Sequence, residues 1–423
     1  MLPIRAWLRR ADRRACALIL PDGTRLSFGD LAGMPGRHGL LTPEGDVATL
    51  ATGIVDAALG GGTLFPLPPG LAQSYRQTLV GLAAQAANPS LALVIATSGS
   101  SGAPKGVRLP WRAIAAASRL SMQALGLAAG DAWLACMPLY HIGGAMILYR
   151  CLRAGATAVV HEGFDVDVVG RDLAARRITH LSLVPPMLAR LLDAGIRPPS
   201  SLRCALVGGA ALTQPLFRRA LAAGWPVCPT YGMTETCALA TVNLRPGADW
   251  EEGDVGCPLP GVRIAPAANG VLQIATPARM AGYLGETGQA ADWIVTCDIG
   301  CVDTQYTQHT QHTQHRVRIV GRADDMLVSA GVNVHPLEVE SRLAACPGVR
   351  DAGVTGLADP LWGDIIACAY EGDRAEASID AWCRLHMPNA RRPRRFLRID
   401  RLPRTASGKL DRLALPSLWE TAP

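Results

Sequence analysis

The stretch that most constrains this chain is an apolar run followed at once by residues with almost no bulk, LALVIATSGSSGAPKGV at positions 91–107. The run predicts a buried strand, because its side chains are continuously apolar. The small residues that follow let backbone N–H groups approach an anion closely, and glycine tolerates the positive φ angles of such a cradle. Hydroxyl groups and the ammonium group of Lys105 add donors and positive charge. The stretch therefore predicts a strand that ends in a polyphosphate-binding loop.

This loop differs from the Walker A motif, in which Gly-Lys is followed by Ser or Thr and then by a helix. Here Lys105 lies between Pro104 and Gly106. Pro104 removes a backbone donor and argues against a regular helix start at this point. On its own, the loop leaves a flexible Gly/Ser turn as the alternative.

The composition sets limits on the partners of the chain. Its 423 residues suffice for two domains, and a net charge of +6 without a long Lys/Arg tract fits a polyanionic small substrate better than nucleic acid. Twelve cysteines without a CxxC pair predict free thiols in a reducing compartment. No apolar run reaches the roughly 20 residues of a membrane span, and no secretory signal is evident at the N-terminus. We therefore expect a cytoplasmic protein.

Helical and strand-like segments alternate between residues 111 and 240, which predicts α/β layers around a largely parallel sheet. Candidate functional residues follow several of these predicted strands, and ligands of such sheets gather beyond the carboxyl ends of the strands. Residues 304–315, TQYTQHTQHTQH, form a three-residue repeat that cannot build a core. The repeat predicts an exposed loop or hairpin expansion, with adventitious metal binding by its histidines as the alternative.

The string YGMTET at 231–236 places chemically different side chains close together. Tyr231 offers a flat face for a purine, Thr234 a hydroxyl for a phosphate, and Glu235 a hard oxygen ligand for Mg²⁺. A strand-to-loop turn with a solvated glutamate is the alternative for this string alone. Two other single residues stand out in motifs, His141 in MPLYHIGG and Lys409 in PRTASGK. Alone, each is typical of an ordinary loop residue.

Taken in their order, these motifs resemble the acyl-adenylate-forming superfamily, which includes acyl-CoA synthetases, luciferases and peptide-synthetase adenylation domains. The resemblance covers the chain from residue 91 onward. It implies an α/β fold with a large N-terminal adenylate-forming domain of layered sheets, at 1–321, and a small mobile α+β cap domain, at 322–423. The N-terminal subdomain ahead of residue 91 is shorter than is usual for the family.

The resemblance also implies a role for each motif in binding ATP, Mg²⁺ and an acid. Glu235 would hold the metal and Thr234 the α-phosphate, while His141 would lie against the acyl pocket. Lys409 would bridge the carboxylate and the α-phosphate, as the main catalytic residue. Asp298, in a TCD string where the family usually has TGD, would accept the ribose hydroxyls. The other implied nucleotide contacts are Thr97, Ser98, Gly99, Ser100, Ser101, Gly102, Lys105, Gly208, Gly209, Ala210, Tyr231, Gly232 and Arg322.

A second group of residues resembles the thioester-forming parts of acyl- and aryl-CoA synthetases. Asp324 would be the hinge about which the cap turns, and Gly331 would let a pantetheine arm pass. Trp362, Arg392 and Arg394 look like the CoA-binding parts of benzoate-type ligases. The chain is most similar to o-succinylbenzoate:CoA and 4-chlorobenzoate:CoA ligases, which implies an aromatic or medium-sized acid, with o-succinylbenzoate as the leading single substrate.

Two alternatives to a CoA ligase stay open at this point. One is an acyl-AMP ligase that loads the thiol of a carrier protein. The other is a degenerate nucleotide-binding remnant, suggested by the short N-terminal subdomain and the repeat. The sequence leaves the oligomeric state open, a homo-oligomer included.

Overall fold

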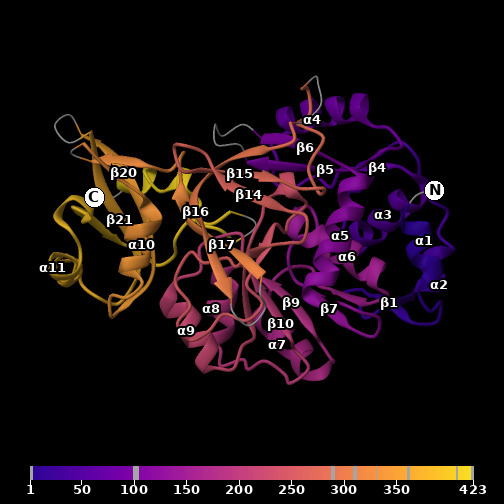
Figure 1. The fold of residues 1–423 in the computed structure, drawn as a ribbon, viewed down its shortest axis with the longest axis horizontal. Coiled ribbons are helices and arrows are strands. Elements are labelled where there is room, and N and C mark those ends of the chain that lie inside the picture. The colour runs from indigo at the N-terminus through magenta and orange to yellow at the C-terminus, as the bar shows by residue number, and fades with distance from the viewer. Residues whose placement is uncertain are drawn as a thin grey trace.

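A computed structural model describes residues 3–98, 104–286, 291–307, 312–329, 331–359, 363–405 and 408–420 of the chain. Figure 1 shows a large body that contains the N-terminus, with a smaller C-terminal part at one end of it. Within the described residues, three sheets lie in the large body and a fourth lies in the C-terminal part. The architecture is therefore the predicted one, a large N-terminal α/β domain followed by a small C-terminal domain.

The central sheet has nine strands in the order β13-β12-β11-β10-β9-β7-β8-β1-β2. Its inner strands, from β11 to β1, are parallel, whereas β2, β12 and β13 pair antiparallel at the two edges. The predicted parallel sheet is thus confirmed. The strands are β1 (Cys16–Ile19), β2 (Arg25–Ser27), β7 (Ala132–Ala135), β8 (Thr157–Val160), β9 (His180–Leu183), β10 (Cys204–Val207), β11 (Val227–Tyr231), β12 (Thr241–Val242) and β13 (Cys257–Pro258).

Helices cover both faces of this sheet, because successive residues of a strand point to opposite sides. On β7, Trp133 packs into one hydrophobic cluster with residues of α1, α5 and α6. The next residue, Leu134, packs into a second cluster with residues of α7, α8 and α9. The helices are α1 (Pro3–Arg10), α5 (Trp111–Leu125), α6 (Ile142–Ala154), α7 (Val166–Ala175), α8 (Pro185–Asp193) and α9 (Gln214–Ala222).

The predicted phosphate loop joins two antiparallel strands of a second sheet, ordered β3-β4-β5-β6. The predicted strand is β5 (Leu91–Ser98), and it pairs with β6 (Pro104–Pro110) so that Thr97 lies opposite Lys105. Pro104 thus begins a strand and not a helix, and the described ends of the predicted loop belong to two antiparallel strands. The remaining elements of this region are α2 (Phe28–Ala32), β3 (Leu40–Leu41), α3 (Val47–Gly60), β4 (Thr63–Leu64) and α4 (Gln73–Ala86).

The Thr/Gln/His repeat lies on the third sheet, ordered β14-β15-β16-β17. Strands β16 (Ile294–Thr307) and β17 (His312–Arg322) form a long antiparallel hairpin, in which Thr304 pairs with His315 and Thr307 with His312. The predicted hairpin expansion is therefore confirmed for the described part of the repeat. The other two strands are β14 (Arg263–Pro266) and β15 (Val271–Ala275).

The C-terminal part has its own sheet, ordered β19-β18-β21-β20 with β22 paired to β21, and its own hydrophobic core. The predicted boundary between residues 321 and 322 lies one residue before the end of β17 at Arg322, and a short connection then leads to β18 at Leu327. Independent folding of the two domains stays a prediction. The elements are β18 (Leu327–Ser329), β19 (Val332–Val334), α10 (Pro336–Leu343), β20 (Val349–Asp359), β21 (Gly363–Gly372), α11 (Glu376–His386), η2 (Asn389–Arg391), β22 (Arg395–Arg398), η3 (Arg412–Ala414) and α12 (Ser417–Glu420).

A bilayer-spanning helix would need about 20 apolar residues. Among the helices of the described ranges, none has the length and apolar character that a membrane crossing demands.

Candidate active site

The C-terminal part contacts the large body through Gly408 and Lys409. Gly408 packs beyond the end of β9, where a Cβ added to this glycine would lie 3.3 Å from Val184 Cγ2. A Cβ added to Gly209, just past β10, would lie 3.1 Å from Lys409 Cε and 3.7 Å from its Nζ. The structure thus places Lys409 at the carboxyl edge of the parallel sheet, where α/β folds bind their ligands.

Gly208 and Gly209 leave room for this approach. Gly209 has φ +76°, in the left-handed region that favours glycine, and a side chain here would crowd Lys409. A Cβ added to Gly208 would lie 2.7 Å from Thr230 Cγ2, so the neighbouring strand β11 excludes a side chain there. Ala210 follows on the exposed side. Of the predicted site residues 208–210, Gly209 therefore lies against Lys409, and the place of all three between adenine and acyl group stays a prediction.

Lys409 and Lys105 are the only lysines in the sequence, whereas every other strongly basic side chain is an arginine. Lys409 keeps access to solvent, yet the protein around its ammonium group lowers its pKa. The charge of Arg322 lowers this pKa further, while Asp298 acts in the opposite direction. Lys409 is therefore electrostatically coupled to both residues that were predicted to contact the ribose.

Asp298, on β16, is a buried carboxylate that two of the predicted site residues hold. Tyr231 Oη donates to Asp298 Oδ2 at 2.7 Å, and Arg322 Nη1 donates to Asp298 Oδ1 at 3.3 Å. Burial and the charge of Asp298 raise the pKa of Tyr231, so its hydroxyl stays a donor. Cys297, which stands where glycine is usual in the family, is exposed and leaves these bonds intact. The residues predicted for adenine and ribose thus form one hydrogen-bonded cluster.

Glu235, on η1 (Thr234–Thr236), contacts a residue that sequence reasoning missed. Tyr283 Oη donates to Glu235 Oε1 at 2.8 Å, and Lys105 Nζ lies 5.3 Å from the centroid of the Tyr283 ring. Burial and the charge of Glu235 raise the pKa of Tyr283, so its hydroxyl also stays protonated. Tyr283 therefore connects the predicted metal ligand to the lysine of the predicted phosphate loop.

A single carboxylate beside a phosphate loop suits Mg²⁺, which keeps several waters and binds one or two carboxylates together with substrate phosphates. Glu235 offers such a ligand, already oriented by Tyr283. Across the described part of the chain, no group of three or more His, Cys, Asp or Glu side chains offers a metal site of another kind. The residues present therefore fit a phosphate-bound Mg²⁺.

We expect Tyr283→Phe to weaken Mg²⁺-dependent binding of ATP while the ring under Lys105 remains. The change deletes a hydrogen bond to a charged group, worth roughly 1.5–3 kcal/mol, so the Kd for Mg·ATP should rise about tenfold or more. Calorimetric titration with Mg²⁺ and with EDTA measures the effect. Tyr75→Phe, at an exposed tyrosine of α4, is the matched control. Equal weakening with and without Mg²⁺ would show that Tyr283 does not act through Glu235.

The backbone that follows Glu235 is strained. Cys237 and Ala238 have φ values of +52° and +82°, and they are the only non-glycine residues with positive φ in the described ranges. Such conformations cost on the order of 1–3 kcal/mol each and are typical of functional sites. Position 232 next to this segment accepts only glycine, because a Cβ added to Gly232 would lie 1.6 Å from Ala238 O. The strain supports the predicted roles of Glu235 and its neighbour Thr234.

The predicted phosphate loop is described only at its two ends. Thr97 Oγ1 donates to Lys105 O at 3.4 Å, and Ser98 is the last residue of β5. The predicted contacts that fall outside the described residues are Gly99, Ser100, Ser101 and Gly102.

His141 precedes α6 as its N-cap residue and lies near the charge of Lys409. Burial lowers the pKa of His141 to about 4, and Lys409 lowers it as well, so the imidazole is neutral at pH 7. Its Nε2 is buried and has no hydrogen-bond partner in the described structure, and its ring packs 4.7 Å from that of Tyr140. A neutral ring of this kind supports a place in the wall of an acyl pocket.

The residues predicted for CoA lie in the C-terminal part. Arg392 and Arg394 follow η2, where Arg394 Nη2 donates to Asn389 O at 3.1 Å and to its Oδ1 at 2.9 Å. Burial and the charges of neighbouring arginines lower the pKa of Arg394, so positive charge is concentrated here. Gly331, in the β18–β19 turn, has φ +76° and open space around its Cα. Trp362 lies outside the described residues.

Asp324, the predicted hinge, lies in the connection between β17 and β18. Arg322 holds its carboxylate with two bonds, from Nε at 2.9 Å and from Nη2 at 2.7 Å. Burial lowers the pKa of Arg322, but the bond to Asp324 and the charges of nearby carboxylates raise it above the usual range. The junction of the two domains is thus tied electrostatically to the Asp298 cluster.

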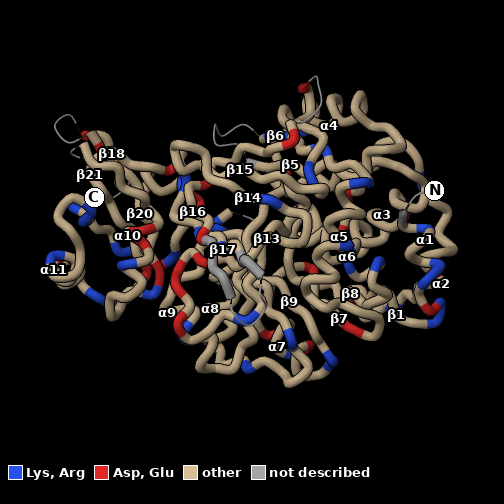
Figure 2. Tube along the Cα trace, viewed as in Figure 1, with Lys and Arg blue, Asp and Glu red and all other residues tan. Residues whose placement is uncertain are grey.

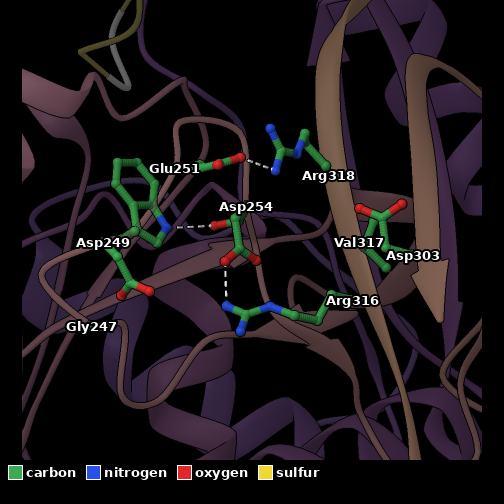
Figure 3. A pocket seen from close by; sticks show the side chains of 9 residues that line it. Gly247, Asp249, Glu251, Asp254, Asp303, Arg316, Val317 and Arg318 are labelled. Carbon is green, nitrogen blue, oxygen red and sulfur yellow. Dashed lines mark hydrogen bonds and ion pairs between the residues drawn. The ribbon is translucent and has the colours of Figure 1, made fainter. Parts of the chain in front are cut away.

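A cavity of about 210 Å³ lies apart from these residues, between the 247–254 loop and β17 (Figure 3). Its walls carry charge, but Arg316 is already paired with Asp254, and Arg318 with Glu251. None of the predicted site residues lines it. The cavity therefore belongs to the attachment of the β16–β17 hairpin to the large body.

Comparison with family models finds two matches, AMP-binding enzyme over residues 65–284 and AMP-binding enzyme C-terminal domain over residues 338–409. A curated relative is the 2-succinylbenzoate–CoA ligase of Bacillus pumilus, which is 36% identical over 343 residues. The match covers 77% of this chain and 68% of that protein.

Among solved structures, o-succinylbenzoate CoA synthetase (MenE) from Bacillus subtilis in complex with the acyl-adenylate intermediate OSB-AMP superposes with a TM-score of 0.83, at 24% identity and 98% coverage of each chain. A double mutant of MenE bound with the product analogue OSB-NCoA gives a TM-score of 0.66, at 24% identity and 100% and 99% coverage. Taken together, the two family matches and the 36% identity to a full ligase place this chain in the AMP-binding enzyme family.

Proposed function

We propose that this chain is an AMP-forming acid:CoA ligase that converts o-succinylbenzoate to its CoA thioester. The observation that carries the proposal is the contact of Lys409, from the C-terminal part, with Gly209 of the large body, near Asp298 and Arg322. A lysine that one domain supplies to the nucleotide site of the other can stabilise the charge that develops during adenylation. A protein that only binds nucleotide would not need this lysine. The activity named for the relatives agrees.

In the first step, a carboxylate oxygen of the acid attacks the α-phosphorus of ATP. A P–O bond forms, the bond to the β-phosphate breaks, and pyrophosphate leaves. Negative charge grows on the α-phosphoryl oxygens, where the ammonium group of Lys409 and the hydroxyl of Thr234 stabilise it. Mg²⁺ held by Glu235 neutralises phosphate charge when it is bound.

The nucleotide is oriented by residues on both sides of Lys409. Tyr231 and Arg322 hold Asp298 so that its carboxylate accepts the ribose hydroxyls, and Tyr231 offers its ring to adenine. Lys105 and the loop that precedes it hold the β- and γ-phosphates. Such fixed geometry lowers the barrier because the reacting atoms are held in position before the reaction.

In the second step, the C-terminal domain turns about Asp324, withdraws Lys409 and brings the Gly331 turn to the acyl-AMP. The thiol of CoA attacks the acyl carbon, a C–S bond forms, the C–O bond to AMP breaks, and the thiol proton passes to solvent. The approach of Lys409 to Gly209 supports the first arrangement for this structure. Arg392 and Arg394 supply concentrated positive charge for the nucleotide phosphates of CoA, which favours CoA over a carrier protein.

Arg150 supports an acid with two carboxylates. It lies on α6, is 2% exposed, and donates from Nε to Ser121 Oγ at 3.0 Å, while its guanidinium lies over the ring of Trp133. No carboxylate of the described residues pairs with it. Burial lowers its pKa to about 10, so it is still charged at pH 7, beside Cys237, which directly follows the YGMTET string. A buried charge normally needs a partner, and the second carboxylate of o-succinylbenzoate would supply one.

We expect Arg150→Met to remove the preference for that second carboxylate. The unmodified protein should favour o-succinylbenzoate over 4-oxo-4-phenylbutanoate, which lacks the ring carboxylate, by roughly tenfold to hundredfold in kcat/KM. The variant should use both acids about equally well, because methionine keeps the volume but not the charge. Arg150→Lys, which keeps the charge, should retain part of the preference. An unchanged preference in Arg150→Met would place the receptor of the second carboxylate elsewhere.

Exchange of labelled pyrophosphate into ATP across a panel of acids tests the proposed function. We expect exchange with o-succinylbenzoate, weaker exchange with benzoate and 4-chlorobenzoate, and thioester formation with CoA. Absence of exchange with every acid would overturn the ligase proposal. Thioester formation on a phosphopantetheinyl carrier protein alone would favour the acyl-AMP ligase instead.

We propose that this reaction takes place in the cytoplasm, because none of the twelve cysteines, all of which lie in the described ranges, forms a disulfide, and reduced cysteines suit a reducing compartment.

A further inference from the structure

The connection between the two domains is built around a row of alternating charges. Arg322 pairs with Asp298 of the large body and with Asp324 of the connection. The next residue, Asp325, continues the row, since its Oδ2 lies 3.1 Å from Arg412 Nε. Figure 2 shows acidic and basic segments close together where α10 and β16 lie near each other, between the two parts. The row thus runs from the nucleotide cluster into the C-terminal domain.

Arg412 holds three groups at once. Its Nη1 and Nη2 donate to the two carboxylate oxygens of Glu340 at 2.7 Å each, and Nη1 also donates to Val354 O at 3.2 Å. Glu340, on α10, is buried and accepts a further bond from Val354 N at 2.8 Å. Burial lowers the pKa of Arg412, but Glu340 and Asp325 raise it above the usual value. The guanidinium is therefore a permanent charge that is fixed on the body of the C-terminal domain.

Arg412 begins η3 only three residues after Lys409. Asp325 is the first residue beyond the proposed hinge at Asp324. The Asp325–Arg412 pair therefore joins the point where the chain enters the C-terminal domain to the loop that carries Lys409.

We infer that Arg412 is a positioning residue for adenylation. Its pair with Asp325 makes the domain entry and the Lys409 loop one rigid body, so a turn at Asp324 moves Lys409 along a defined path. Without the pair, the loop keeps its fold but Lys409 loses its fixed place beside Gly209. This inference rests on the proposed two-step function and deepens it, since it names the contact that sets the position of the catalytic lysine.

The test compares two variants of the full chain, Asp325→Ala and Arg412→Gln. Single-turnover release of pyrophosphate reports the first step, and consumption of a supplied acyl-AMP with CoA reports the second. We expect about a tenfold or larger fall in adenylation for each variant, with the second step within about twofold of the unmodified protein. The double variant should be no slower than the slower single variant, because both changes break the same pair.

Three further variants separate positioning from simple loss of stability. Arg412→Lys keeps a charge that can reach Asp325 but loses the fork on Glu340, so it should recover part of the adenylation rate. Arg412→Gln combined with Lys409→Ala should be no slower than Lys409→Ala alone. Asp380→Ala breaks a pair with Arg384 of 2.8 Å within α11 and should leave both steps unchanged.

Equal losses of rate in both steps, or additive losses of the adenylation rate in the Asp325–Arg412 double variant, would overturn the inference. Arg412 would then have only a role in the stability of the fold. If Arg412→Gln does not fold, Asp325→Ala and Arg412→Lys decide together. Asp325→Ala leaves the Arg412–Glu340 pair in place but also removes the 4.0 Å contact of Asp325 with Arg322 Nε, which Arg412→Lys keeps. Pyrophosphate exchange by the unmodified protein is measured first, so a failure of the proposed function is seen there and is distinct from a failure of the coupling.

Discussion

Lys409→Ala should abolish formation of the acyl-adenylate and largely spare thioester formation from a supplied acyl-AMP. The side chain lies against Gly209 and is electrostatically coupled to Asp298 and Arg322, so its charge is beside the predicted nucleotide site. Loss of one donor aimed at developing charge costs roughly 10²–10³ in rate. Because the second step needs Lys409 to leave the site, removal of its side chain takes nothing from that step.

Rapid-quench measurement of pyrophosphate release, compared with consumption of acyl-AMP and CoA by the same preparation, separates the two outcomes. Lys409→Arg is the informative companion, because it keeps the charge but offers a bulkier group to the narrow space beside Gly209. We expect it to restore little of the adenylation rate. If Lys409→Ala slowed both steps equally, the lysine would have a general structural role and the assignment would be wrong.

Asp324→Pro should have the opposite effect, with pyrophosphate exchange preserved and CoA transfer blocked. Proline fixes φ near −65° and restricts the residue before it, so it stiffens the connection at the point of the proposed turn. Within the described chain the Asp324 amide donates no hydrogen bond, so proline removes none. Because Lys409 lies against Gly209 in the structure, a locked connection should hold the arrangement proposed for the first step and slow the second step on the order of a hundredfold.

The carboxylate of Asp324 must be separated from the stiffness of proline, because it accepts two bonds from Arg322. Asp324→Ala removes the carboxylate and leaves the backbone free, so we expect it to affect both steps modestly. The same assay pair measures both variants. Loss of pyrophosphate exchange in Asp324→Pro, at the level of its loss of CoA transfer, would contradict a two-arrangement mechanism here.

Much of this architecture could be predicted from the sequence, because local patterns determine it. The continuous apolar run at 91–96 lies in β5, and the segment between His141 and Gly155 forms α6, within the region where alternating helices and strands were predicted. Asp298 and Tyr231 could be predicted as site residues, because each lies in a short motif whose residue types indicate a role in nucleotide binding. The structure adds that they are bonded to each other across 67 positions of the chain.

The contacts that escaped prediction are long-range and leave no local pattern. Tyr283 lies in the turn-like string GYLGE, 48 positions from Glu235, and nothing in that string indicates its partner. The pair of Arg412 with Glu340 spans 72 positions. Arg150 did leave a signal, because it is one of only two charged residues in a largely apolar helix, and such a charge indicates either a long side chain that reaches solvent or a buried functional charge. The structure shows that Arg150 is buried, which favours the second of these two interpretations.

The scarcity of lysine makes this protein unusually simple to examine by covalent labelling. Only two ε-amino groups are present, Lys105 in the large body and Lys409 in the C-terminal domain. The lowered pKa of Lys409 leaves more of it as the free amine, the form that attacks an anhydride or an active ester. Brief acetylation followed by mass analysis of the two lysine-containing peptides would measure how far each lysine is protected. Repeating it with ATP, with the acid and with CoA would show which ligand shields Lys105 and which shields Lys409.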